Sequence, residues 1–333
     1  MSETENGKLN NNGDNLISRY GVPFLLFVAT FATTTIAGAY WVVTTSTGLE
    51  ISQLSEGLPY SISILAILGF HEFGHFFASK FHKVKATLPY FIPFPTIAGM
   101  LNFGTMGAVI KTKTPIYNKK ALFDIGIAGP VAGFVISLIV LIYGFQNLPG
   151  KEFIISIHPD FDLPTYGQDG LSLAFGENLL FIILRELFAN SPDGFIPPMS
   201  EIYHYPYLCA GWFGLFVTAL NLLPVGQLDG GHIIYAMFGE KAQEKIAWVA
   251  MFFLLFAGGM GVINQFYETG ISIGWTGWFL WALLLYFVIK VKHPPVYDNS
   301  PIGIGRLLIG YLGILIFILS FIPMPFIIGP GVL

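Results

Sequence analysis

The stretch SISILAILGFHEFGH, residues 61–75, decides the fold because an apolar run contains His71, Glu72 and His75. Extended to Leu58–Phe81, this run is long enough to cross the roughly 30 Å hydrocarbon core of a bilayer as one helix. Ionisable groups inside such a helix cost several kcal/mol when they are unpaired, so they are rare and mark functional sites. The segment therefore predicts a membrane-spanning helix that carries a polar site.

The whole chain has the composition of a membrane protein. Hydrophobic residues make up 54% of it and charged residues 11%, with a mean hydropathy of +0.66, whereas a soluble domain is about 25% charged. We predict an all-α polytopic membrane protein with about seven transmembrane helices. The expected spans are Tyr20–Val43, Leu58–Phe81, Ala121–Phe145, Tyr205–Pro224, Ile246–Val262, Ile273–Ile289 and Leu307–Ile327.

Two segments interrupt this pattern. Prolines and glycines break the apolar stretch Tyr90–Ile110. Side chains of two kinds alternate along Met106–Thr114, which also contains β-branched residues, as is typical of a strand. We therefore expect a short membrane-associated β-strand or hairpin near residues 90–114. Ser172–Phe188 mixes apolar and charged residues and is expected to form an interfacial helix.

We predict one membrane domain at residues 20–333, with a catalytic core of about 58–232, after a disordered cytoplasmic tail at residues 1–19.

The basic residues predict the orientation. With the N-terminus in the cytoplasm, every one of the 16 Lys and Arg residues lies inside except Lys151 and Arg185. His71 then lies about 20 Å along its span from Leu58, nearer the cytoplasmic side. The polar N-terminus resembles neither a signal peptide nor an Arg-rich transit peptide, which favours a prokaryotic plasma membrane.

Charge and cysteine content exclude other classes of protein. The net charge of −4 gives no indication of a nucleic-acid partner, so the expected surroundings are the lipid bilayer and other membrane proteins. Cys209 is the only cysteine, which excludes an intrachain disulfide and a cysteine-based zinc site.

The HEFGH segment predicts a metal site. His71 and His75 lie one helical turn apart and point the same way, so their imidazoles can hold one zinc ion. Glu72 can accept a proton from water at that zinc and is the candidate catalytic base. The alternative is that both histidines are interior residues that hydrogen-bond to a neighbouring helix. Two His and a Glu at this spacing within a span favour the metal site over this alternative.

Asp229 is the candidate third ligand. It lies in NLLPVGQLDGGH, residues 221–232, where an apolar span ends at a Gly/Pro-rich turn that can fold back beside the second span. A catalytic zinc takes three protein ligands and leaves one position open. The alternative is that Asp229 caps a helix that starts near His232.

HEFGH in a span, followed by NLLPVGQLDGGH, resembles the site-2 protease family of intramembrane zinc metalloproteases. Residues 103–110 (FGTMGAVI) and 122–130 (LFDIGIAGP) also resemble it, most closely its cyanobacterial and plant plastid members. The resemblance implies that His71, His75 and Asp229 bind one zinc ion and that Glu72 activates water. It also implies a substrate that is a transmembrane protein, such as a membrane-tethered regulator. The PDZ and CBS domains of many members have no counterpart in this sequence.

Two further features are candidates for substrate binding. A peptide in a helix is protected from hydrolysis, so we expect the strand containing Gly107, Ala108 and Val109 to pair with an unwound substrate. The alternative is a hairpin that only connects two spans. Asn221 could bond the substrate backbone or a developing oxyanion, or it could join two helices.

The other histidines carry no predicted chemistry. His232 is expected to lie beside the site at most, and surface positions are expected for His82, His158, His204 and His293.

Other functions fit the sequence less well. A di-iron membrane enzyme needs more histidine motifs, and the metalloprotease class that trims prenylated proteins needs a Glu as third ligand in a second motif that is missing here. A membrane metal transporter or a non-proteolytic regulator with the same metal site is the remaining alternative. Glu72 argues against it, because a site that only binds metal has no need of a base.

Overall fold

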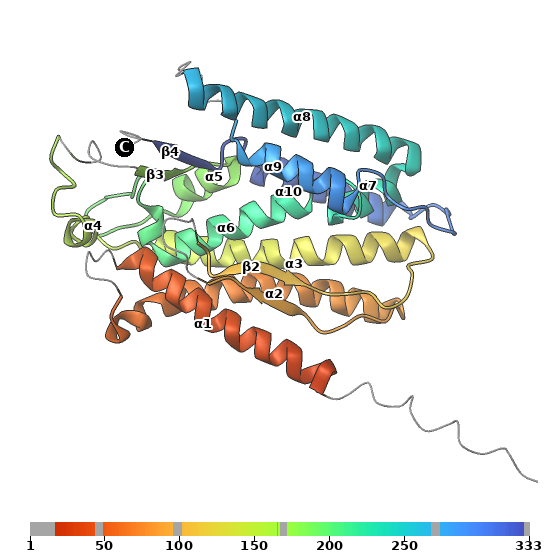
Figure 1. Cartoon of the computed structure of the whole chain (residues 1–333), viewed down its shortest axis with the longest axis horizontal. Coiled ribbons are helices and arrows are strands. Elements are labelled where there is room, and N and C mark those ends of the chain that lie inside the picture. The colour runs from red at the N-terminus through yellow and green to blue at the C-terminus, as the bar shows by residue number, and fades with distance from the viewer. Residues whose placement is uncertain are drawn as a thin grey trace, which may run out of the picture.

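The computed structural model describes residues 17–43, 49–95, 102–164, 166, 172–267 and 274–329. Residues 1–16 of the predicted tail, residues 96–101 of the predicted hairpin and Ile273 of the predicted sixth span lie outside this description. The chain is mainly helical, with long helices that run side by side across the view of Figure 1. The prediction of a helical fold with a small β segment is confirmed.

Four helical segments are long and apolar enough to cross a membrane within the described ranges. They are Arg19–Val42, Ile51–Phe81, Lys119–Gln146 and Glu240–Asn264, and they contain α1 (Val22–Val42), α2 (Leu58–Phe81), α3 (Lys119–Gln146) and most of α8 (Glu240–Tyr267). The outer faces of α1 and α8 expose large apolar side chains, including Phe24 at 69% and Phe252 at 73%. Such faces suit contact with lipid and would be costly in water.

The other three predicted spans correspond to shorter helices. These are α6 (Pro206–Asn221), α9 (Gly277–Leu284) with its π-helical continuation η4 (Leu285–Ile289), and α10 (Ile304–Ser320). The predicted end of the last span at Ile327 is wrong. Helix α10 stops at Ser320, and strand β4 (Phe326–Gly329) follows because Pro323 and Pro325 cannot continue a helix.

Helices α2, α3 and α6 form the centre of the molecule and pack against one another. The middle of α6 is enclosed on all sides, and Trp212 and Leu215 have no exposed surface. Three short α-helices also occur. Along the chain, α4 (Glu152–Ile157) and α5 (Leu179–Phe188) come between α3 and α6, and α7 (Asp229–Phe238) comes between α6 and α8.

The predicted hairpin is present but shorter than expected. Strand β1 (Tyr90–Pro93) pairs antiparallel with β2 (Thr105–Val109), with Tyr90 opposite Val109 and Phe91 opposite Ala108. The strand predicted to reach Thr114 ends at Val109, and only an isolated bridge between Ala86 and Thr112 continues the pairing.

A second sheet was not predicted. Strand β3 (Ser172–Phe175) pairs antiparallel with β4, so residues more than 150 positions apart in sequence lie side by side. The predicted interfacial helix at Ser172–Phe188 is therefore wrong in its first part, and only α5 is helical. No local pattern in the sequence indicates that residues 172–175 pair with a strand near the other end of the chain.

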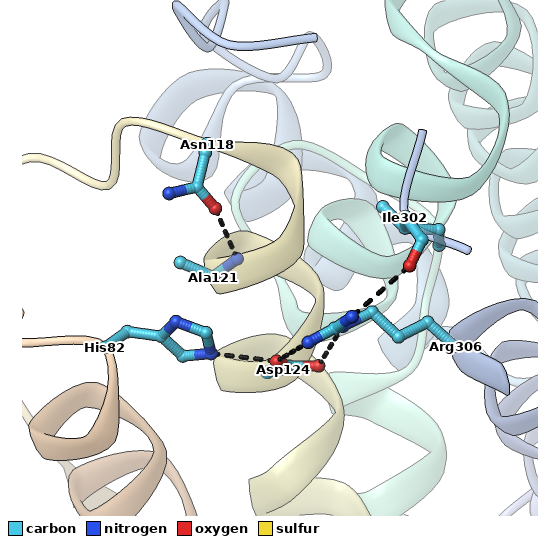
Figure 2. Close-up of polar contacts among 6 residues, drawn as sticks. All are labelled: His82, Asn118, Ala121, Asp124, Ile302 and Arg306. Carbon is cyan, nitrogen blue, oxygen red and sulfur yellow. Dashed lines mark hydrogen bonds and ion pairs between the residues drawn. The ribbon is translucent and has the colours of Figure 1, made fainter. Parts of the chain in front are cut away.

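An ion-pair cluster joins three helices near one end of the molecule (Figure 2). Arg306 at the start of α10 donates two hydrogen bonds of 2.8 Å to the carboxylate of Asp124 on α3. His82, directly after α2, lies 2.8 Å from the same carboxylate. Asn118 caps α3 through a bond of 2.8 Å from the Ala121 amide. The cluster fixes the ends of α2, α3 and α10 relative to one another.

Candidate metal centre

The three predicted metal ligands come together between α2 and α7. His71 and His75 lie one turn apart on α2, and their Nε2 atoms are 3.0 Å apart. Asp229 Oδ2 lies 3.4 Å from His71 Nε2 and 3.3 Å from His75 Nε2. Ligands of a tetrahedral zinc with bonds of 2.0–2.1 Å are about 3.3 Å apart, so one ion fits this triangle. Two nitrogens and one carboxylate oxygen are also a donor set that zinc accepts.

A tight turn between α6 and α7 brings Asp229 to this position. Gly226 in the turn has φ +55°, and a Cβ there would overlap the carbonyl oxygen of Lys290. Helix α7 begins at Asp229 itself, with Leu228 at the N-cap position. The alternative role of Asp229 as a cap for a helix near His232 is therefore wrong, and its carboxylate faces the two histidines.

Helix α3 holds the ring of His75 in place. His75 Nδ1 lies 2.7 Å from the backbone carbonyl oxygen of Ile125, to which it can donate its proton. This bond leaves Nε2 free to face the centre, as is usual for a metal-binding imidazole. Gly129, one turn further along α3, lies against the same ring, and a Cβ there would overlap it. The close approach of α3 therefore supports the orientation of a candidate ligand.

Glu72 lies beside the triangle without belonging to it. Its side chain is buried, and it is close enough to His75 and Asp229 to interact with both electrostatically. Its carboxylate also interacts with the backbone amide of Ile110, the residue that follows β2. Among the described residues, the potential metal-binding group here is limited to His71, His75 and Asp229. Glu72 thus has the position of a proton acceptor rather than that of a ligand.

Residues 59–258 match the family model described as Peptidase family M50. The chain belongs to this family. The match contains HEFGH and the segment with Asp229, so the predicted relationship to the site-2 protease family is confirmed.

Curated relatives of this M50 family chain include plant proteins. "Probable zinc metalloprotease EGY2, chloroplastic" of Oryza sativa subsp. indica is 27% identical over 293 residues, which cover 86% of this chain and 46% of the relative. "Probable zinc metalloprotease EGY1, chloroplastic" of Arabidopsis thaliana is 33% identical over 189 residues, which cover 57% of this chain and 31% of the relative. The chain spans less than half the length of these relatives. No solved structure matches it.

Asn221, the last residue of α6, reaches the M50 family centre. Its Nδ2 lies 3.3 Å from His71 Nε2. The side chain therefore ends beside the candidate ligands.

Strand β2 lies next to α2, the helix that carries His71, Glu72 and His75. It contacts α2, and Ile110 at its end reaches Glu72. Val109 is half exposed, and Gly107 has φ +98° with no atom within 4 Å of the position a Cβ would take. The described part of the sheet has two strands, so Ala108 and Val109 pair on one side with β1, while Gly107 lies where the register shifts.

The prediction that four histidines lie at the surface is wrong for two of them. His204 is 1% exposed and His293 is 4% exposed. His293 Nε2 lies 2.7 Å from Nδ1 of His232 on α7, so the two imidazoles form a partly buried pair. His204 directly precedes the span predicted to start at Tyr205, and His293 follows the span predicted to end at Ile289, so the sequence places both at span edges and only the tertiary packing encloses them.

Proposed function

We propose that this chain is an intramembrane zinc metalloprotease that cleaves transmembrane segments of other membrane proteins. The observation that supports this most is the triangle of His71, His75 and Asp229 beside Glu72, built on a helix long enough to span the bilayer. Relatives named as probable zinc metalloproteases support zinc as the metal and hydrolysis as the chemistry.

The residues around the triangle divide the reaction between them. His71, His75 and Asp229 hold zinc, which supplies a Lewis acid that polarises the substrate carbonyl and makes water more acidic. Glu72 accepts the proton of the attacking water and passes it to the nitrogen of the departing amine. Asn221 donates a hydrogen bond from Nδ2 to the substrate oxygen on which negative charge develops.

The substrate is held as an extended strand. Its helix must unwind locally, because a helical peptide has its carbonyls already hydrogen-bonded. We propose that Gly107, Ala108 and Val109 pair with the unwound segment on the edge of β2 away from β1. An apolar groove of about 790 Å³ lies between α1, α2 and β1, lined by Phe27, Gly69 and Phe91 among others. The groove suits an apolar substrate segment on its way to the centre.

The finer membrane arrangement is part of the proposal. We propose seven spans in one membrane domain, a cytoplasmic N-terminus and an active site nearer the cytoplasmic side, supported by the distribution of basic residues. The substrate is a transmembrane protein such as a membrane-tethered regulator. The relatives are named as chloroplastic, and the long apolar helices of this chain fit an integral membrane protein.

The experiment compares the purified wild type with Glu72→Gln in detergent, using a model single-span substrate. Zinc content and cleavage are measured on the same samples. We expect about one zinc at this centre in both proteins and cleavage by the wild type alone, because glutamine cannot accept the proton. His71→Ala and Asp229→Ala should lose the metal and the activity together.

Two results would contradict the proposal. Cleavage by Glu72→Gln at the wild-type rate would remove Glu72 from the mechanism. Full zinc occupancy in Asp229→Ala would remove Asp229 from the ligand set.

A further inference from the structure

A second group of metal-ligand side chains lies away from the M50 centre. His158 follows α4. Glu201 is at the N-cap position of the short 3-10 helix η3 (Ile202–His204), and His204 is its last residue. The Nε2 atoms of His158 and His204 are 3.0 Å apart. Glu201 Oε2 is 3.7 Å from each of these nitrogens. Within the described ranges, only this group and the His71 group bring three such ligand atoms together.

The geometry of the second group matches that of the first. Both triangles have two Nε2 atoms 3.0 Å apart and one carboxylate oxygen, at 3.4 and 3.3 Å in the first and 3.7 Å in the second. A tetrahedral zinc needs ligand separations of about 3.3 Å, so small adjustments suffice for one ion. The two imidazoles favour zinc over the alkaline-earth ions, which prefer oxygen ligands, and a carboxylate is a third ligand that zinc accepts.

The burial of the group lacks a compensating charge. Glu201 and His204 are each 1% exposed, and Glu201 Oε2 accepts no hydrogen bond from a described residue. A buried carboxylate oxygen without a partner costs free energy, which a bound cation would remove.

Surrounding residues orient the group as they orient metal ligands elsewhere. Tyr166 donates a hydrogen bond of 2.9 Å to Glu201 Oε1, which directs Oε2 toward the histidines. The Ser200 hydroxyl also interacts with this carboxylate. Glu201 and His204 are three residues apart in a 3-10 turn, so their side chains lie on one face.

We propose that His158, Glu201 and His204 form a second zinc site, which fastens the segment between α3 and α6 to the start of α6. The site is separate from the M50 centre, because α6 begins at Pro206 and ends at Asn221, about 24 Å away at 1.5 Å per residue. The ion joins residues 43 positions apart, so it stabilises a long loop that local contacts cannot close. Its role is structural, and it takes no part in peptide hydrolysis.

The test uses the full-length chain in detergent, with His71→Ala and His75→Ala combined to remove the first centre. After zinc loading and removal of free metal, we expect two zinc ions per wild-type chain and one per double variant. Adding Glu201→Gln or His158→Gln to the double variant should leave none. Glu186→Gln, at an exposed carboxylate on α5, is the matched control and should keep one ion.

Cobalt provides a readout that does not depend on activity. The double variant loaded with Co²⁺ should show the visible absorption of a tetrahedral nitrogen and oxygen site. His158→Gln should abolish this absorption band. The His158 side chain is 21% exposed, so the substitution should leave the melting temperature of the metal-free protein unchanged.

A failure of the second zinc site can be distinguished from a failure of the proteolytic proposal. A double variant without zinc or a cobalt band would overturn the second site and leave the first untouched. An ion that persists after both Glu201→Gln and His158→Gln would also overturn it, because these ligands would not hold the metal.

Discussion

Gly129 shows how a residue without a functional group can control the metal centre. It lies against the His75 ring on α3, where a Cβ would overlap the imidazole. We expect Gly129→Ala to push the ring away from Asp229 and to weaken zinc binding by about 10–100-fold, the usual effect of disturbing the support of a ligand. Zinc affinity is measured by competition with a chelator.

Gly305→Ala is the control for this substitution. Gly305 lies in the first turn of α10, and no atom lies within 4 Å of the position its Cβ would take. This variant should bind zinc as the wild type does. Equal affinity in Gly129→Ala and Gly305→Ala would show that His75 has room to move, which would contradict the role of α3 as its support.

At the residue scale, the sequence predicts ligands better than it predicts their support. His71 and His75 can be predicted because helical periodicity alone places i and i+4 on one face. Asp229 needs the turn before it, which glycine and proline indicate. The carbonyl of Ile125, which orients His75, leaves no trace in the sequence because every residue has one.

At the scale of the helices, the Asp124–Arg306 pair should stabilise the packing of α3 on α10. The pair is bidentate and only partly exposed, at 25% for Asp124 and 32% for Arg306. Arg306→Gln should lower the free energy of unfolding by about 1–2 kcal/mol, because charge-assisted bidentate bonds are among the stronger ones. Thermal unfolding in detergent measures the loss.

Lys292→Gln is the comparison for Arg306→Gln. Lys292 pairs with Glu244, but its side chain is 66% exposed, and exposed pairs contribute about 0–1 kcal/mol. If both variants unfold at the same temperature, the Asp124–Arg306 pair contributes no more than a surface contact, and other packing must hold α10.

The role of the groove between α1 and α2 in substrate entry can be tested by substituting one of its lining residues. A Cβ on Gly69 would meet Phe91 at 3.7 Å, an ordinary contact, whereas a large side chain there would fill the space beside Phe27. We expect Gly69→Trp to bind zinc normally but to cleave a transmembrane substrate at least about tenfold more slowly, because the scissile segment would be misplaced.

Gly259→Trp provides the matched control on α8, where no atom lies within 4 Å of the position its Cβ would take. Cleavage at the wild-type rate by Gly69→Trp would mean that substrates do not pass through the groove. The same variants should be assayed with a short soluble peptide, since a blocked groove should affect the transmembrane substrate more.

Secondary structure could be predicted where it depends on local pattern. The apolar runs predict α1, α2 and α3 closely, because a membrane helix satisfies its own backbone, but the run Ile246–Val262 covers only the middle of α8. The β3–β4 sheet depends on contacts between distant segments, and the pattern of neighbouring residues contains no information about it. The end of α10 had a local signal in Pro323 and Pro325, which the span predicted from hydropathy alone passed over.

At the scale of the whole molecule, the same limit explains the missed histidine cluster. His158 and His204 look like loop residues in the sequence, and only the packing of the segment before α6 buries them with Glu201. Orientation in the membrane can be predicted without knowledge of tertiary contacts, because it depends on the distribution of many basic residues between the two sides.

This orientation can be tested with the natural cysteine content. Cys209 is fully buried, so an impermeant thiol reagent should not label the intact wild type, which serves as the control. Lys85 and Glu152 are exposed and lie beyond opposite ends of the antiparallel α2–α3 pair. We expect Glu152→Cys to be labelled from outside intact cells, and Lys85→Cys only after the membrane is opened, because the basic loops stay in the cytoplasm. The reverse pattern would invert the molecule, and labelling of both from outside would mean that α2 and α3 do not both cross.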